Sequence, residues 1–175
     1  MSDPEVQKKA FGLKEIVLTD ITGETVVTLP AALKLGFEED VITAQFPGND
    51  EIQGVMTQPQ GVKGTFEQGG YPLEAVAIMT GHTIDKTGVT PDQIATLNAD
   101  SSAYPYFVIY GKSLADEGDD LHIKIKKAKL TKGINGTFER GKFFTMDTEF
   151  YGVRVDGSAY EVVGNETAQD LEAFS

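Results

Sequence analysis

The chain has 175 residues, a formal net charge of −12 and no Cys. This length suits one domain with a real hydrophobic core, with or without flexible arms. Without Cys the fold has no disulfide, and thiolate metal sites and Cys nucleophiles are excluded. The N-terminus lacks the apolar run of a secretory leader, and no window is apolar over the length of a membrane span. We therefore expect no membrane association and folding in a cytosol.

The charge is unevenly distributed along the chain. Residues 121–142 carry seven Lys and Arg and one acid, so the remainder is more acidic than the total indicates. An acidic balance opposes binding to phosphate, which argues against a protein that grips DNA. Two interpretations stay open: an acidic surface that serves solubility, or a polarised subunit that presents opposite charges to different neighbours.

The N-terminal part is predicted to be mainly β. EIVLTD (15–20) and ETVVTL (24–29) flank a short turn and predict a hairpin, and VITAQF (41–46) predicts a third strand. Residues 47–61 contain two Pro and three Gly, which interrupt regular structure. We predict a long, partly β loop there, and loops of such length in compact domains are usually functional or disordered.

Two short helices are predicted in the middle of the chain. The segment 71–81 has helical apolar spacing and ends on Gly81, a residue typical of a helix stop. Thr90 and Gln93 have the spacing of a capping box, which predicts a second helix at 91–97.

The last third of the chain has the alternation of β-strands. Strands are predicted at 104–111, 122–130, 136–139, 143–155 and 160–163. In 122–130 the apolar alternation changes phase, and a β-bulge near Lys126–Lys127 would restore one apolar face. We predict arms at 1–12 and 158–175 around a domain at 13–157. The expected fold class is mainly β, a barrel or sandwich with one or two short flanking helices.

A nine-residue repeat links the two parts. GVKGTFEQG (61–69) recurs as GINGTFERG (133–141), with six of nine positions identical. Each copy predicts a Gly-rich turn and a short strand with Phe66 or Phe138 pointing inward, and Gly141 suits a positive φ in the turn that follows. The copies are either two equivalent halves of one β fold or a convergence on common turn chemistry.

The residues that carry enzyme chemistry are sparse. His82 and His122 are the only histidines, and no nucleophile, metalloprotease or nucleotide-binding motif is present. The acidic run 116–120 does not have the spacing of an EF-hand. We therefore expect no catalytic residue, no cofactor and no metal ligand, and a protein that is not an enzyme.

The stretch from Tyr104 to Val155 resembles a known family. Its order is an aromatic strand (YPYFVIYGKSL), an acidic turn, a basic strand (LHIKIKKAKLTKG) and then INGTFERGKFFTMDTEFYGV. This order resembles the C-terminal half of the major tail proteins of long-tailed bacteriophages, which form the tail tube. GVKGTFEQGGYPLEAVAIMTG resembles the segment that joins a strand to the helix in these proteins, and the likeness covers roughly residues 14–155.

The resemblance implies a structural subunit that stacks as rings, with six-fold symmetry, into a tube for genome ejection. Its partners are copies of itself and other tail proteins (tape measure, distal tail and terminator proteins), and viral DNA passes through without specific binding. The implied location is the virion tail, after assembly in the host cytoplasm. An acidic lumen suits this role, because it repels phosphate.

The chain offers candidates for both kinds of surface. We expect contacts between subunits at Lys124, Lys126, Lys127, Lys129, Asn49, Asp50, Ile52, Val55 and Met56. The candidate lumen-facing acids are Glu67, Glu139 and Glu149.

Three other functions stay open at this stage. A type VI secretion tube, or the tube of another contractile injection system, uses the same fold physics. A β-sandwich binding module would show exposed aromatics around a groove. A hydrolase without recognisable motifs is the remaining alternative.

Overall fold

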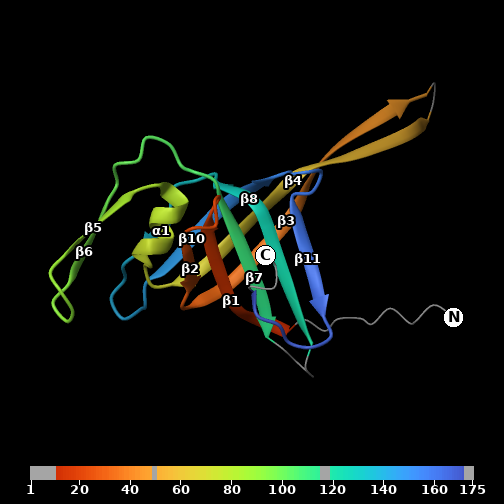
Figure 1. The fold of residues 1–175 in the computed structure, drawn as a ribbon. Coiled ribbons are helices and arrows are strands. Elements are labelled where there is room, and N and C mark those ends of the chain that lie inside the picture. Colours follow the sequence, from red (N-terminus) through yellow and green to blue (C-terminus); the bar gives the residue numbers. More distant parts are fainter. Residues whose placement is uncertain (1–10, 49–50, 115–118, 172–175) are drawn as a thin grey trace.

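The computed structural model describes residues 11–48, 51–114 and 119–171, and the chain forms an almost entirely β fold with one helix (Figure 1). The elements are β1 (Phe11–Asp20), β2 (Val26–Leu29), β3 (Ala32–Pro47), β4 (Ile52–Gly69), α1 (Leu73–Thr80), β5 (Thr83–Thr87), β6 (Ile94–Asn98), β7 (Phe107–Leu114), β8 (Asp120–Leu130), β9 (Asn135–Thr137), β10 (Thr145–Val153) and β11 (Tyr160–Asn165).

Nine strands form one antiparallel sheet in the order β2-β1-β7-β8-β10-β4-β3, with β11 beside β8 and β9 beside β10. Strands β5 and β6 form a separate hairpin. The large sheet curves until its two halves face each other. A Cβ on Gly111 of β7 would lie 2.5 Å from Leu35 of β3, although these strands are not neighbours in the sheet. The predicted mainly β, sandwich-like fold with a flanking helix is confirmed.

One hydrophobic core lies between the two halves. The largest fully buried side chains come from β1, β4, β7, β8, β10 and α1: Ile16, Leu18, Val62, Phe66, Met79, Phe107, Ile109, Ile125, Met146 and Phe150. Because successive side chains of a strand point to opposite faces, the residues between these form the outward faces of the sheet. The same alternation of side chains along each strand therefore determines which residues lie on the outer surface of the protein.

Several local predictions are confirmed. β1 and β2 form the predicted hairpin, and Gly23 in its turn has a φ of 77°. Helix α1 lies within 71–81 and ends at Gly81, whose left-handed φ of 71° lets its N–H bond to the carbonyl of Ala77.

The β-bulge in β8 is also confirmed. Phe107 pairs with Ala128 and Ile109 with Ile125, so β8 has one more residue than β7 in this interval. The extra residue lies at Lys126–Lys127. Ile125 and Ala128 are consequently both buried, and the two lysines between them are not.

The predicted loop at 47–61 is wrong, because most of this segment belongs to β4. The strand begins at Ile52 and pairs with β3 along its whole length. The glycines that indicated a loop allow close approach within a sheet: a Cβ on Gly61 would lie 2.5 Å from the carbonyl oxygen of Gly152. Pro47 ends β3, and Pro59 stands at a register shift.

The predicted helix at 91–97 is also wrong. Residues Ile94–Asn98 form β6, which pairs with β5 from Thr83↔Asn98 to Thr87↔Ile94. A helix of seven residues has little stability of its own, so pairing with a neighbouring strand decides the structure here.

The two copies of the repeat are not equivalent halves. The first copy belongs to β4 and the second begins with β9, and both pair with β10 from opposite sides. Gly64 faces Phe150 whereas its counterpart Gly136 faces Met146, so the copies are out of register by four residues. Phe66 is buried as predicted, but Phe138 is 88% exposed and the prediction that it points inward is wrong.

The arm boundaries need correction at both ends. β1 begins at Phe11, inside the predicted arm 1–12, whose first ten residues lie outside the described part of the chain. At the other end, β11 pairs with β8 within the predicted arm 158–175. The domain therefore continues to at least Asn165, and of the predicted arm 158–175 only the last four residues lie outside the described part of the chain.

Candidate assembly surfaces

The outward side of β3, β4 and β10 forms a polar face with charges of both signs. Paired positions place Lys34, Glu67 and Asp147 in one row across the three strands. With the neighbouring rows and the turn after β8, this polar face contains Lys34, Glu38, Asp40, Lys63, Glu67, Lys132, Asp147 and Glu149. Carboxylates outnumber ammonium groups on it, so its net charge is negative.

Ion pairs hold part of this face in place. Lys63 Nζ lies 2.6 Å from Asp40 Oδ1, and Tyr151 donates a hydrogen bond of 3.0 Å to the other oxygen of Asp40. Hydrogen bonds from Lys63 and Tyr151 lower the pKa of Asp40. Lys132 Nζ lies 2.7 Å from Glu149 across the turn. The hydrogen bonds from Lys63 and Tyr151 therefore favour the ionised form of Asp40.

The three predicted lumen-facing acids do not share one surface. Glu67 and Glu149 both lie on the polar face, on adjacent strands β4 and β10. Glu139 lies in the connection from β9 to β10 and forms an ion pair of 2.9 Å with Lys142. Of the three acids, Glu67 and Glu149 therefore share one surface, and Glu139 lies on a separate connection.

The four predicted contact lysines lie on β8, the neighbour of β10 in the sheet, where Lys129 pairs with Tyr151: Lys124, Lys126, Lys127 and Lys129. We call them the lysine face. The ammonium groups of Lys127 and Lys129 lie 4.4 and 4.8 Å from the ring centre of Tyr106, and Lys126 forms an ion pair of 2.6 Å with Glu161. Lys126, Lys127 and Lys129 are thus half-buried against groups of their own chain.

The hairpin of β3 and β4 extends far beyond the body of the protein (Figure 1). We call residues 41–60 the β3–β4 arm. Its strands pair from Val41↔Pro59 to Pro47↔Ile52. Within the described residues, neither strand has another partner there, because β4 joins β10 only from Gly61 onward. A two-stranded hairpin without further support is marginally stable in water.

Apolar side chains cover much of the arm. Ile42, Phe46, Ile52, Val55 and Met56 are each more than half exposed, with Met56 at 68%. The arm sequence contains two acids, Asp50 and Glu51, and no Lys or Arg. Three of the predicted contact residues, Ile52, Val55 and Met56, therefore lie on one exposed apolar projection. The other two, Asn49 and Asp50, lie outside the described residues.

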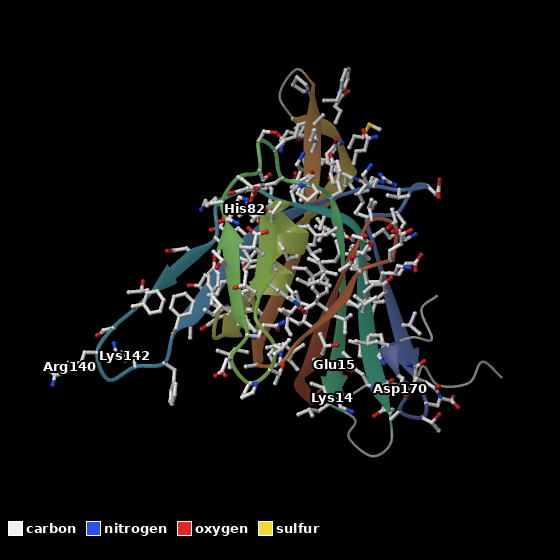
Figure 2. All side chains as sticks on the ribbon, turned by 60° about the vertical axis from the view of Figure 1, so that its left-hand side comes forward. Lys14, Glu15, His82, Arg140, Lys142 and Asp170 are labelled. Carbon is white, nitrogen blue, oxygen red and sulfur yellow. The ribbon has the colours of Figure 1, made fainter. Side chains whose placement is uncertain are left out.

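A second projection is the connection from β9 to β10, residues 138–144, which we call the aromatic loop. Phe138 and Phe143 are 88% and 98% exposed. Phe144 lies between Phe138 and Tyr71, with ring centres 4.6 and 5.7 Å away. Arg140 and Lys142 stand at the outer end of this loop, away from the body (Figure 2).

A buried ionic cluster holds the C-terminal segment on the sheet. The carboxylate of Asp120 accepts hydrogen bonds from the side chain of Asn165 at 2.7 Å and the backbone N–H of Gln169 at 2.9 Å. Lys112 Nζ lies 3.5 Å from Asp120 and also donates to the carbonyl of Gln169. His122 Nε2 lies 3.0 Å from the same carboxylate. All three titratable side chains are almost fully buried.

The electrostatics of this cluster favour an ionised Asp120. Burial alone would raise the pKa of the carboxyl, but hydrogen bonds from Gln169, Asn165 and His122 outweigh it and lower the pKa to about 2. This cluster was not predicted from the sequence, because the acidic run 116–120 was compared only with a calcium-binding loop and His122 belongs to no motif. Only pairing of β11 with β8 brings the C-terminal segment over Asp120.

Other site types find no support in the described residues. No group of three or more His, Asp or Glu side chains there is arranged to hold a metal ion. No helix in the same residues has the length and apolar character that crossing a membrane requires.

Comparison with known proteins identifies no family and finds only a likeness to solved structures. No family model and no curated protein matches the chain. Among solved structures it is similar to the tube terminating cap of the anti-feeding prophage, with 12% identity and a TM-score of 0.45 over 96% of this chain and 98% of that one. It is also similar to a chain of the anti-feeding prophage baseplate, with 13% identity and a TM-score of 0.44 over 95% and 99%. Likeness at this level defines neither the family nor the function of the chain.

Proposed function

We propose that the protein is a structural subunit that assembles with its own copies into the tube of a phage-type tail, through which DNA passes. The proposal assigns no catalytic group, cofactor or metal to the chain. Its partners are copies of itself along the tube and other tail proteins at the two ends.

The β3–β4 arm carries this proposal. A long hairpin without Lys or Arg, with exposed apolar side chains and unpaired edges, tends to associate with other chains and is therefore unfavourable in a monomer. In an assembly, a neighbouring subunit can pair with these edges and bury the apolar side chains. The arm is thus the segment that we expect a neighbouring subunit to cover.

The distribution of charge supports the same role. The polar face carries net negative charge on β3, β4 and β10, and the lysine face lies on the neighbouring strand β8. In a ring, a negative inner surface repels DNA phosphates and lets the duplex slide. We assign the polar face, with Glu67 and Glu149, to the lumen, and the lysine face to contacts with neighbours.

The test is assembly of the purified full chain. We expect sedimentation velocity to show large particles that grow with protein concentration, and negative-stain microscopy to show hollow tubes with a regular ring repeat. The double substitution Val55→Asp/Met56→Asp on the arm should abolish the tubes and leave the thermal midpoint unchanged, because both side chains are exposed in the monomer.

A matched control is Val89→Asp/Ile94→Asp near the β5–β6 hairpin, where both side chains are also largely exposed. This variant should still form tubes. Monomers of the wild-type chain at high concentration would refute the proposal and favour a β-sandwich binding module. Tubes that form normally with the substituted arm would remove the arm from the argument.

The second candidate function is a subunit of a secretion tube or of another contractile-injection tube, which would use the β3–β4 arm and the two charged faces in the same way. The cargo separates it from a phage tail, since only a tail conducts DNA. Nuclease-protected DNA in particles isolated during ejection supports the tail, and protein cargo in the lumen contradicts it.

A further inference from the structure

A groove lies on the outward side of β2, β1 and β7. Val17 of β1 pairs with Tyr110 of β7, and the next outward row brings in Val26 of β2. These side chains, with Leu171 of the C-terminal segment, line a cavity of about 490 Å³. The groove thus has an apolar floor and one wall made by the end of the chain.

The buried ionic cluster builds this wall. Lys112 faces outward beside Glu15, yet it is covered, because it donates to the carbonyl of Gln169. Asp120 holds the same segment through the N–H of Gln169. The segment therefore lies across the sheet, with Leu171 at the edge of the groove.

The rim of the groove is acidic at Glu15 and Asp170, which both line it, and the side chain of Asp170 is 97% exposed. On the β8 side of the groove, Lys124 lies 5.3 Å from the ring centre of Tyr110. Apolar floor and acidic rim together select a ligand that combines an apolar or aromatic anchor with a cation.

The aromatic loop of the same chain has this combination. Phe138 and Phe143 are almost fully exposed, and Arg140 and Lys142 lie between them in the sequence. Only one acid, Glu139, accompanies the two cations in the loop. Within one molecule the loop cannot reach the groove, because Arg140 and Lys142 lie on the opposite side of the body from Glu15 and Asp170 (Figure 2).

We propose that the aromatic loop of one copy docks into the β2–β1–β7 groove of the next copy, with Phe143 on the apolar floor and Arg140 and Lys142 against Glu15 and Asp170. This inference rests on the proposed function and names the contact that joins neighbours. A knob on one side and a hole on the other make a head-to-tail interface. Such an interface repeats from copy to copy and closes into a ring when the rotation per copy permits.

The absence of Cys allows a direct test in the full chain. The double variant Phe138→Cys/Thr28→Cys keeps Phe143 and both cations of the loop and places its second thiol at a residue that lines the groove; it is assembled and then oxidised. We expect a ladder of covalent oligomers on a non-reducing gel, because each copy has one thiol on the knob and one in the hole. The single variants should stop at dimers. The control Phe138→Cys/Val89→Cys, whose second thiol lies outside the groove, should also give no ladder beyond dimers.

Charge reversal tests the rim without a covalent link. Arg140→Glu/Lys142→Glu and Glu15→Lys/Asp170→Lys should each reduce assembly at least tenfold at equal concentration, and the combination of all four should restore it. Circular dichroism and the thermal midpoint of each variant show that it folds. Phe143→Ser should also weaken assembly. Because the side chain of Phe143 is 98% exposed, this substitution should leave the fold of the monomer intact.

The outcomes separate this inference from the proposed function. Wild-type tubes without a Cys ladder, or tubes that survive charge reversal and Phe143→Ser, would overturn the loop-in-groove contact and leave the tube subunit standing. A wild-type chain that stays monomeric would refute the proposed function itself. A ladder together with restored assembly in the four-residue swap supports both.

Discussion

Asp120 accepts a hydrogen bond of 2.9 Å from the backbone N–H of Gln169, which lies 49 residues later in the chain. The carboxylate is fully buried beneath the segment that it holds, and Lys112 lies 3.5 Å from it. This contact ties β8 to the C-terminal segment and connects the core of the fold to the groove on its surface.

Asp120→Asn is expected to destabilise the protein by about 3 kcal/mol, because it leaves Lys112 as a buried charge without its counter-ion. Chemical denaturation of the purified variant measures the loss. Asp170→Asn is the matched control. It removes an exposed carboxylate 4.0 Å from the same Lys112 and should change the free energy of unfolding by less than about 1 kcal/mol. Equal effects of the two substitutions would contradict a role for the buried contact.

The same carboxylate makes stability depend on acid pH. The pKa of Asp120 is about 2 in the folded protein, below its ordinary value of 3.8. Its contribution to stability is therefore fully present above the ordinary value and is lost as the pH falls through about 2. The shift corresponds to about 2 kcal/mol. In urea unfolding between about pH 6 and about pH 2, wild type should lose this amount relative to Asp120→Asn. A difference between the two proteins that stays constant with pH would argue against the depressed pKa.

Gly64→Ala tests the close packing of β4. A Cβ at this position would overlap the ring of Phe150 and lie 2.7 Å from the carbonyl oxygen of Gly36. We expect a loss of about 2 kcal/mol, measured as a lower denaturation midpoint. Gly54→Ala on the same strand is the control, since its nearest neighbour, Phe46 Cβ, lies 3.9 Å away. A Gly64→Ala protein as stable as the control would show that the backbone relaxes at this point.

Glu67→Lys/Glu149→Lys tests the assignment of the polar face to the lumen. Wild-type tubes should not retain DNA. The variant tubes are expected to bind DNA at low salt and release it as salt rises, because Lys–phosphate contacts release counterions. Co-sedimentation of the tubes with labelled duplex measures the binding. Glu166→Lys, an exposed acid in the C-terminal segment away from the polar face, supplies the control. If the two variants bind DNA equally, the polar face does not line the channel.

Lys127→Glu/Lys129→Glu tests the lysine face as a contact between subunits. The stability of the monomer should fall by no more than about 2 kcal/mol, because each lysine contributes only a partly exposed contact with Tyr106. Assembly should weaken much more, which concentration-dependent sedimentation would show. Lys86→Glu on β5 is a comparison at another lysine that already has an intramolecular partner, Glu74. Unchanged assembly of the double variant would place the lysine face outside the subunit contacts.

The elements with local signals were predictable from the amino-acid sequence alone. The β1–β2 hairpin, helix α1 with Gly81 at its end, and the bulge at Lys126–Lys127 all follow from alternation and from turn residues within a few positions. The mainly β class follows from the same alternation, because period-two patterns bury one face of a strand wherever the strand is placed.

The pairing of the remaining segments depends on contacts between distant parts of the chain. The sequence 47–61 has the Pro and Gly content of a loop, but pairing with β3 extends it into the arm. The capping residues Thr90 and Gln93 predicted a helix over residues 91–97, but residues 94–98 pair with β5 and form a strand. Phe138 and Phe66 occupy the same position in the two copies of the repeat. Phe138 is nevertheless exposed, because the second copy lies on the other side of β10. Contacts between residues far apart in the chain decide these cases, and a local pattern carries no information about its distant partner.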